Sequence, residues 1–176
     1  MITQTYKVKG LTPYFFNKWT NDKTPKTVAQ SIQVAKNRVY KNDQGLFIPG
    51  LQFKGSLIHA VSLQKMKIEK SNKRAVELIR AVLQIEPKEI ALGLDESAIQ
   101  IIPIPTIVAE NKMKEIQYAY IESGWKVEFK AVFHEILEPE FIAEGFEWAG
   151  LLCGVGGRRN HGNGRFEITE SNIIVN

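Results

Sequence analysis

The sequence predicts an α+β fold in which a single domain spans residues 1–176. Several segments alternate polar and apolar residues, as strands do when one face is buried. Other segments carry apolar residues at the spacing of one helix face. These segments follow one another as β-α-β and then β-α-β again. That order is typical of a ferredoxin-like core, here with β-hairpin and loop insertions.

Alternation and turn signals define the predicted strands. They are residues 2–9, 33–40, 46–48, 83–85, 99–108, 115–121, 125–136, 165–169 and 173–175. The turn Asn42-Asp43-Gln44-Gly45 predicts one hairpin, and Glu122-Ser123-Gly124 predicts another that joins residues 115–121 to 125–136. Pro103 and Pro105 confine their segment to an edge strand or an extended arm, because proline cannot donate a ladder hydrogen bond.

Apolar residues at helical spacing predict helices over residues 51–66, 73–83 and 139–153. Pro139 suits the first turn of the last helix, and Glu138 and Glu140 lie where the helix dipole favours negative charge. The segment from Tyr14 to Pro25 is rich in Asn, Lys and Thr, so we predict a long loop there.

Composition excludes several classes of protein. Hydrophobic residues make up 44% and charged residues 24%, which suits a globular domain with a core. No apolar run reaches the roughly 18 residues that a membrane span needs, and the first residues do not resemble a signal peptide. Cys153 is the single cysteine, so an intramolecular disulfide is impossible and a cysteine-built zinc site is not expected. We expect a cytoplasmic protein with no cofactor, no metal and no membrane contact.

The net charge of +4 hides a strong asymmetry along the chain. Residues 1–80 carry 15 Lys/Arg and 4 Asp/Glu, whereas residues 81–147 carry 5 Lys/Arg and 13 Asp/Glu. A basic face suggests a polyanion, most often nucleic acid. The alternative is that the acidic stretch pairs with the basic one, within the fold or between copies.

The segment after the last predicted helix, residues 154–166, reads GVGGRRNHGNGRF. It holds five glycines, three arginines and one histidine, with no acidic residue. Glycine allows close approach to a ligand, successive N–H groups can surround an anion, and arginine can grip a phosphate with two hydrogen bonds. It is neither a Walker loop nor a dinucleotide fingerprint, because the Lys-Ser/Thr ending and the third glycine are missing. We predict a phosphate-binding loop; the alternative is a flexible surface loop with a glycine helix cap.

A second motif, residues 47–57, reads FIPGLQFKGSL and predicts a strand, a Pro-Gly turn and a helix start. Free N–H groups at a helix start attract anions, and Lys54 would add positive charge beside Ser56. The alternative is a plain turn with Lys54 in solvent.

Together the two motifs resemble the RAMP superfamily of CRISPR-associated proteins, of the backbone-subunit type. Those proteins have an RRM-like, ferredoxin-like core. They carry a glycine-rich loop with an Arg or Lys before the last strand, and an Ile-Pro-Gly, Lys-Gly element opening the first helix. Residues 9–13 (KGLTP), residues 46–50 (LFIPG) and Trp125 are also similar to small stand-alone RAMP-like proteins of phages and prophages. Backbone subunits are usually longer and carry a sizeable thumb insertion.

The resemblance implies binding of single-stranded RNA, often by copies lined along a guide RNA, in a bacterial host cell. It implies phosphate contacts for Lys54 and Ser56 at the helix start. The loop residues that it implies are Gly154, Gly156, Gly157, Arg158, Arg159, Gly162 and Gly164. His161 and Arg165 lie in the same segment and complete the predicted loop contacts.

The predicted loop after the first strand interleaves aromatic rings with lysines. Aromatic faces stack on any base, so this loop is a second candidate contact, with Phe16, Lys18 and Trp19 at its centre. Its aromatic and basic residues are Tyr14, Phe15, Phe16, Lys18, Trp19, Lys23 and Lys26. The alternative is that two or three of these rings anchor the loop to the core. The lysine-rich run over residues 65–74 either follows a nucleic-acid backbone or is a solvated helix end.

Three functions of different classes fit the sequence. The first is a protein that binds single-stranded nucleic acid, RNA before DNA, and assembles head-to-tail as a homo-oligomer or filament through its basic and acidic parts. The second is a metal-independent RAMP-type endoribonuclease with His161 or His59 as the acid–base group. The third is a structural or inhibitory protein-interaction module of phage origin. We favour the first, because the sequence supplies no partner for either histidine.

Overall fold

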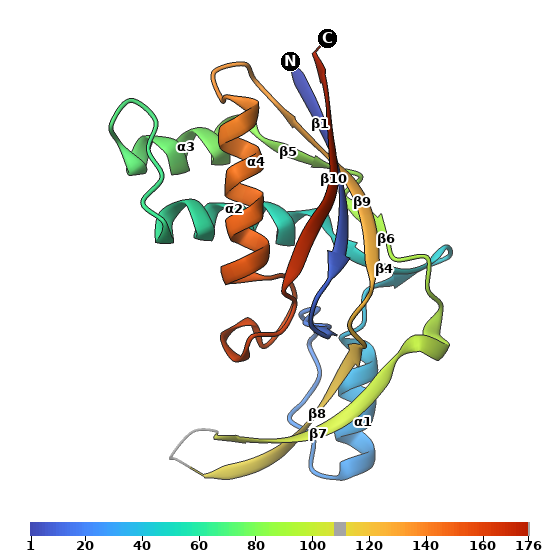
Figure 1. The fold of residues 1–176 in the computed structure, drawn as a ribbon. Coiled ribbons are helices and arrows are strands. Elements are labelled where there is room, and N and C mark those ends of the chain that lie inside the picture. Colours follow the sequence, from blue (N-terminus) through green and yellow to red (C-terminus); the bar gives the residue numbers. More distant parts are fainter. Residues whose placement is uncertain (108–111, 176) are drawn as a thin grey trace.

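The structure is a computed structural model, and it describes residues 1–107 and 112–175. Figure 1 shows two parts: a sheet covered on one face by helices, and an arm made of two long strands with one helix against it. Strands β1 (Ile2–Gly10) and β10 (Phe166–Val175) pair along their length, which places the two ends of the described chain side by side.

The main sheet is antiparallel and has the order β10-β1-β9-β5, with β9 at Lys126–Phe133 and β5 at Gln84–Glu86. Alternation along β1 buries Ile2, Gln4, Tyr6 and Val8 on one face. This alternation is the pattern from which the strand is predicted, and the strand predicted over residues 83–85 forms β5 at one edge of the sheet.

Three helices cover the buried face of this sheet. They are α2 (Gly50–Leu63), α3 (Asn72–Val82) and α4 (Pro139–Trp148), and α4 continues as a π-helical turn, Ala149–Cys153. An aromatic cluster joins sheet to helices: the ring centroids of Phe53 and Phe129 lie 4.6 Å apart, and those of Tyr6 and Phe146 lie 4.8 Å apart. All four rings are buried, so the core lies between the sheet and these helices.

The arm is a second antiparallel sheet of order β2-β8-β7, formed by Tyr14–Phe15, Met113–Ile121 and Gln100–Ile107. Helix α1 (Val28–Asn37) packs against β8. A small third sheet, β3-β4-β6, contains the predicted hairpin as β3 (Lys41–Asn42) and β4 (Gly45–Pro49), with β6 at Glu89–Ala91. Two 3-10 turns, η1 (Glu96–Ala98) and η4 (Arg159–His161), complete the elements.

The predicted strand over residues 33–40 is wrong, because this segment belongs to α1. The helix begins at a capping box: Thr27 Oγ1 accepts a hydrogen bond from the Gln30 N–H at 3.2 Å, and Gln30 Oε1 accepts one from the Thr27 N–H at 3.3 Å. Thr-x-x-Gln is a recognised helix-start signature, and here it outweighs the local alternation of apolar residues.

The predicted hairpin between residues 115–121 and 125–136 is also wrong. The two strands exist as β8 and β9, but they belong to different sheets. The chain changes sheet at the turn, where the Gly124 N–H donates to the Gly10 carbonyl at 2.8 Å and the Gly10 N–H donates to the Trp125 carbonyl at 2.7 Å. The two short strands predicted over residues 165–175 form one strand, β10.

Two short strands are not among the predicted elements: β2 lies at the start of the loop predicted from Tyr14 to Pro25, and β6 lies after Pro87. The three predicted helices are confirmed, as is the proline-containing segment as an edge strand, β7; residue 108 lies outside the described residues. In the described part of the chain, no helix has the length and apolar character that crossing a membrane requires.

Candidate nucleic-acid interface

Residues 154–165, hereafter the Gly/Arg loop, are tied to the chain that enters β2. The Gly157 N–H donates to the Phe15 carbonyl at 2.7 Å, and the Gly164 N–H donates to the Pro13 carbonyl at 2.9 Å. Thr12 Oγ1 donates to the Gly162 carbonyl at 3.0 Å and accepts from the Arg165 N–H at 2.8 Å. The loop therefore extends the arm's sheet beyond β2, through a bridge between Phe15 and Gly157.

Two glycines of the loop hold backbone conformations that a side chain would disrupt. At Gly156, with φ +82°, an added Cβ would lie 2.7 Å from the Phe15 carbonyl oxygen. At Gly164, with φ +71°, it would lie 1.8 Å from the Val155 carbonyl oxygen. Both positions combine a left-handed φ with a close backbone approach, which favours glycine. The loop thus has a packed, defined path and is not a simple glycine cap.

Arg158 points across the arm. Its own backbone is left-handed, with φ +53°, and its guanidinium carbon lies 4.9 Å from the centroid of the Tyr118 ring. That separation is within the range of a cation–π contact. Arg159, Asn160 and His161 are exposed at the loop's tip. Within the described residues, neither Arg158 nor Arg159 forms an ion pair with a carboxylate.

Tyr118 belongs to an aromatic cluster on one face of the arm, hereafter the platform, formed by Phe15, Tyr118 and Tyr120. Phe15 and Tyr120 stack with ring centroids 5.1 Å apart and planes 17° apart, and Phe15 meets Tyr118 edge-on at 6.2 Å. Cross-strand pairing puts Ile102 opposite Tyr118, and Ile102 is 38% exposed. The platform therefore continues onto β7 as a partly exposed apolar face.

Helix α1 packs against the other face of β8. Gln117, Ala119 and Ile121 alternate with the platform residues along β8, and all three are buried. The Gln117 N–H donates to Ser31 Oγ of α1 at 3.3 Å. Because α1 packs against this side of β8, the platform is the side of the arm that leaves the rings of Tyr118 and Tyr120 partly exposed beside the Gly/Arg loop.

The two residues predicted at the start of α2 are occupied within the fold. Lys54 Nζ donates to the Arg80 carbonyl at 2.9 Å and to the Leu83 carbonyl at 2.6 Å, so it caps the end of α3, and burial lowers its pKa. Ser56 is fully buried, and its hydroxyl donates to the Ala149 carbonyl at 3.4 Å. The first N–H of the helix, at Gly50, already donates to the Lys88 carbonyl. We therefore remove Lys54 and Ser56 from the interface.

The aromatic loop divides between core and surface. Phe16 is buried and meets the buried Tyr14 edge-on at 5.1 Å, so the predicted stacking of Phe16 on a base is wrong and the anchoring alternative holds for both rings. Phe15 is also buried, at 7% exposure, and stacks on Tyr120 within the platform. Trp19 is 79% exposed, and Lys18 is exposed with its N–H bound to the Arg38 carbonyl at 3.0 Å. Lys18 therefore lies beside the end of α1.

The histidines come from separate elements. His59 is exposed on α2, and the His134 Nδ1 accepts from the Ile136 N–H at 3.2 Å. Across residues 1–107 and 112–175, the His161 imidazole has no side-chain hydrogen bond, and no group of three His, Cys, Asp or Glu residues could hold a metal ion. An acid–base pair of the kind a ribonuclease uses is not assembled around His161 in these residues.

Arg165 ends the loop, and the buried Cys153 directly precedes it. One terminal guanidinium nitrogen of Arg165 is buried and has no hydrogen-bond partner within the described residues. Burial raises the pKa of the Cys153 thiol, while the charges of Arg165 and Arg159 oppose that rise. Cys153 therefore stays a protonated core residue near neutral pH, and the positive field of the loop extends down to it.

No protein-family model and no curated protein matches the sequence. Solved structures do match the fold. The chain aligns with a chain of the Type III-B Cmr-beta complex bound to cognate target RNA, with a TM-score of 0.65 and 11% identity over 98% of this chain and 60% of that one. It aligns with Cmr6 from Pyrococcus furiosus with a TM-score of 0.56 and 12% identity, over 96% of this chain and 99% of Cmr6. It also aligns with a chain of a Type IV-B CRISPR complex with a TM-score of 0.54 and 11% identity, over 99% of this chain and 91% of that one. The chain has a RAMP fold.

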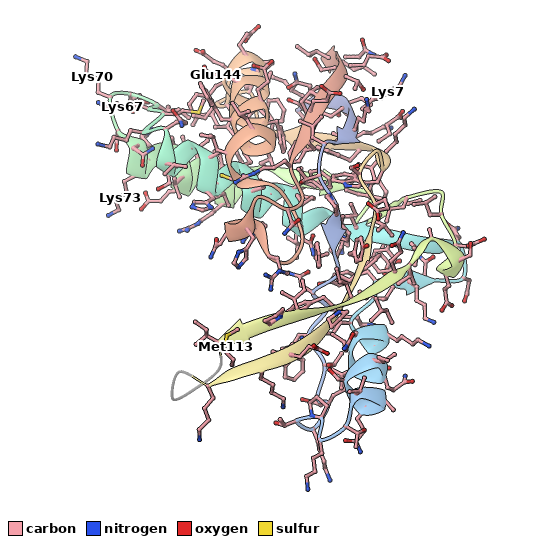
Figure 2. The ribbon with its side chains drawn as sticks, turned by 60° about the horizontal axis from the view of Figure 1, so that its bottom comes forward. Lys7, Lys67, Lys70, Lys73, Met113 and Glu144 are labelled. Atoms are coloured by element: carbon pink, nitrogen blue, oxygen red, sulfur yellow. The ribbon has the colours of Figure 1, made fainter. Side chains whose placement is uncertain are left out.

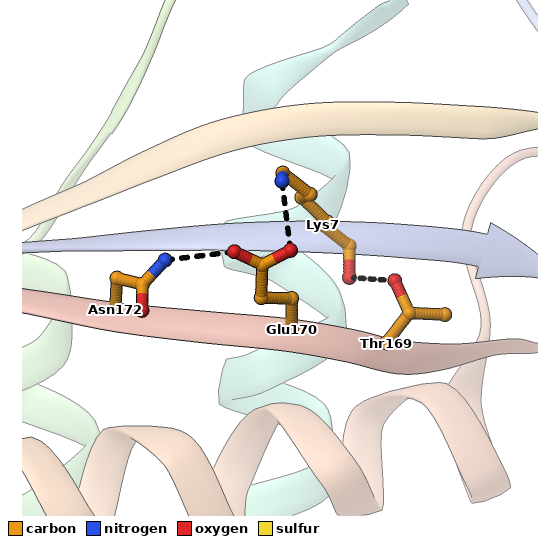
Figure 3. A network of polar contacts seen from close by, with 4 residues as sticks. All are labelled: Lys7, Thr169, Glu170 and Asn172. Carbon is orange, nitrogen blue, oxygen red and sulfur yellow. Dashed lines mark hydrogen bonds and ion pairs between the residues drawn. The ribbon is translucent and has the colours of Figure 1, made fainter.

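The RAMP fold confirms the expected RRM-like α+β core. RRM domains stack bases on aromatic residues of a four-stranded sheet, yet the open face of this main sheet is different. Lys7 Nζ lies 2.7 Å from Glu170 Oε2, and Lys9 Nζ lies 3.8 Å from Glu167 Oε1. Figure 3 shows that Glu170 also accepts from Asn172, at 2.9 Å, so its carboxylate is well partnered. The bond from Lys7 lowers the pKa of Glu170 and raises that of Lys7.

Sequence reasoning missed Tyr118 and Tyr120. Alternation over residues 115–121 identified the strand but not which face would be covered. The available signal was two tyrosines spaced by two residues, which places both rings on one face of a strand. Assigning that face to a ligand also required knowing that α1 covers the opposite side.

Proposed function

We propose that this chain binds single-stranded nucleic acid, RNA in preference to DNA, along the Gly/Arg loop and the platform. The observation that carries the proposal is the position of Arg158. Its guanidinium has no carboxylate partner among residues 1–107 and 112–175 and rests on Tyr118, at the border between the loop and the aromatic face. A cation beside an open aromatic surface is the pairing that a strand of alternating phosphates and bases requires.

Each part of the surface has its own task in the proposed mode. Arg158 and Arg159 bind phosphates, and the rigid path set by Gly156 and Gly164 holds them in place. Tyr118 offers a ring face for stacking, which is worth about 1–3 kcal/mol per base in comparable proteins. Neither task depends on sequence, so we expect broad sequence tolerance and strong salt dependence.

The choice of RNA rests on fold similarity. One RAMP-fold neighbour was determined bound to its cognate target RNA, and another belongs to a CRISPR complex. This chain spans 60% of the length of the first neighbour. RNA binding by that larger protein therefore supports RNA as the ligand of this chain only as part of the proposal.

We further propose that copies assemble head-to-tail. Figure 2 shows Lys67, Lys70 and Lys73 gathered at one end of the molecule, with Glu144 on α4. Exposed glutamates of α4, including Glu140 and Glu144, provide the opposite charge. Mass photometry of the protein with a 40-nucleotide poly-U strand, a length of about four site sizes, tests this. Discrete multiples on the RNA support assembly, and one copy per strand at saturation contradicts it.

The main test is fluorescence anisotropy of labelled 20-nucleotide RNA and DNA, a length of about two site sizes, across a salt series. We expect Arg158→Ala/Arg159→Ala to weaken RNA binding about tenfold and to flatten the log–log salt slope by about 1.4, since each phosphate contact contributes ~0.7. The control, Lys7→Ala/Lys9→Ala, removes the same charge from the main sheet, where both lysines are paired with glutamates. Equal losses in both variants would contradict a specific role for the loop.

The same samples separate a binding protein from a ribonuclease. We expect RNA recovered after incubation in EDTA to be intact on a denaturing gel, because no acid–base partner faces His161 in the described residues. RNA shortened by the wild type but not by His161→Ala would instead establish the metal-independent ribonuclease.

A further inference from the structure

A cleft of about 780 Å³ lies on the covered side of the arm, away from the platform. Helix α1 forms one wall, and the segment from η1 into β7 forms the other. Ile101 lines the cleft and pairs across strands with the buried Ala119, so the cleft opens on the reverse of the face that carries Tyr118. The Gly/Arg loop and the platform contribute no lining residue to it.

The floor of this cleft is apolar and its rim is basic. Val39, Ile99 and Ile101 form the floor, and Val39 is 3% exposed. Lys18 and Lys36 line the rim, and neither has a carboxylate partner within residues 1–107 and 112–175. Two unpaired ammonium groups above an apolar surface leave a positive potential over a place where a flat ring could lie.

The rim is also ordered. The Lys18 N–H is bound to the Arg38 carbonyl at 3.0 Å, which fixes the backbone of Lys18 at the end of α1. Gln33 Nε2 donates to Asn37 Oδ1 at 2.9 Å, and Asn37 Nδ2 donates to Asp22 Oδ1 at 3.0 Å. On the opposite wall, Lys41 Nζ lies 2.8 Å from Glu96 Oε1. This ion pair neutralises Glu96, the acidic residue that lines the cleft. The second carboxylate oxygen of Glu96 can accept a further hydrogen bond.

We propose that this cleft is a second binding site, separate from the RNA surface, that takes one nucleoside monophosphate unit. The base lies over Ile99 and Ile101, the phosphate lies between Lys18 and Lys36, and Glu96 accepts a hydrogen bond from a hydroxyl or an exocyclic amine. The cleft volume falls within the range of small-molecule sites, about 300–1,000 Å³. Inorganic phosphate alone would leave the apolar floor unused, and an acyl chain would leave the two lysines unused.

The unit has two sources, a free nucleotide or the 5′ end of a strand, and the experiment separates them. Amide chemical shifts of the ¹⁵N-labelled protein are followed with AMP, UMP and inorganic phosphate up to about 5 mM, a range suited to weak sites. We expect AMP to shift the amides of Asn37, Ile99 and Ile101 with saturation, and phosphate to shift them at least about fivefold more weakly. A tetranucleotide with a 5′-phosphate and one with a 5′-hydroxyl are then compared in the Arg158→Ala/Arg159→Ala background. If only the phosphorylated form shifts these amides, the cleft binds the 5′ end of a strand.

Lys36→Glu is the decisive variant, because Lys36 is exposed on α1 and its replacement leaves the core untouched. We expect at least about a tenfold loss of AMP affinity, whereas Lys67→Glu, with the same charge change far from the cleft, retains it (Figure 2). Unchanged AMP binding in Lys36→Glu, phosphate shifts equal to those of AMP, or no shifts at all would each overturn the proposal. Retained RNA binding in Lys36→Glu separates this site from the proposed function.

Discussion

The open faces of the two sheets differ in what they offer a strand of nucleic acid. On the main sheet, Lys7 and Lys9 are paired with Glu170 and Glu167 across adjacent strands. On the arm, the guanidinium of Arg158 lies over the Tyr118 ring, and the Tyr120 hydroxyl donates to Gln100 Oε1 at 2.8 Å and to Glu122 Oε1 at 3.3 Å. Lys7 and Lys9 of the first face are thus paired within the fold, whereas the second face still has a cation and ring surface to offer.

This difference shows why an RRM-like topology does not by itself identify the binding surface. In RRM domains, the sheet binds RNA because it carries exposed aromatics. Here the residues of β1 on the open face are Thr3, Thr5, Lys7 and Lys9, and none is aromatic. The rings lie instead on β2 and β8, and the Gly/Arg loop pairs with β2 through the bridge between Phe15 and Gly157. The proposed interface rests on the chemistry of these residues and not on the architecture alone.

The largest effect is expected from changing the backbone that shapes the loop. Gly164→Ala places a methyl group against the Val155 carbonyl in a left-handed conformation, so we expect the free energy of unfolding to fall by about 3 kcal/mol. Urea denaturation measures this loss. We also expect weaker RNA binding than in Arg158→Ala/Arg159→Ala, because both arginines lose their support.

Gly162→Ala is the matched control for this prediction. Gly162 has a similar backbone, with φ +80°, but a Cβ there meets nothing within 4 Å. We expect a loss of only about 1 kcal/mol, due to the left-handed conformation alone. If both variants lose the same stability, the close packing at Gly164 is not what holds the loop.

The next effect concerns the ring on which Arg158 rests. Tyr118→Ala removes the stacking surface, and we expect RNA affinity to fall about 30-fold, equivalent to ~2 kcal/mol. Tyr118→Phe keeps the ring and should stay within about threefold of wild type. Anisotropy at one fixed salt concentration compares the three proteins. Wild-type affinity in Tyr118→Ala would remove the platform from the interface.

A smaller effect is expected at Lys54, which distinguishes a structural lysine from a phosphate-binding one. Lys54→Met keeps the aliphatic length but removes the donor to the Arg80 and Leu83 carbonyls. We expect a stability loss of about 1 kcal/mol and RNA affinity within about twofold of wild type. Reduced RNA binding with unchanged stability would restore the role that the helix-start motif predicts.

The positions of these variants also show which parts of the fold and of the candidate site the sequence alone predicts. Alternation predicted β1 and helical spacing predicted α2, because both signals come from one buried face. The segment with Gly156 and Gly164 was identifiable as a specific loop, because so many glycines and arginines rarely gather for a simple cap. The partners of Lys54 were not predictable for a physical reason: they are carbonyls 26 and 29 residues away at the end of α3, a tertiary contact that no local pattern contains.

The choice of partner for each strand was the second feature that the sequence did not predict. The short turn before Trp125 suggests a hairpin, but the hydrogen bonds at Gly10 redirect β9 into the main sheet. As a result, β8 is left to pair with β2 and β7, and this partition creates the platform. Strand alternation fixes which side chains share a face, whereas the choice of partner strand depends on the whole chain.

The smallest effect is expected on the main sheet. Lys7→Ala/Lys9→Ala removes two positive charges, as Arg158→Ala/Arg159→Ala does, but both lysines are already paired with glutamates across β1 and β10. Removing them leaves Glu167 and Glu170 exposed and negative at a distance from the platform, so we expect RNA affinity to change by less than about twofold. The salt slope should stay that of wild type, because no phosphate contact is lost. A tenfold loss with a flatter slope would place the strand on the main sheet and reverse the assignment of the two faces.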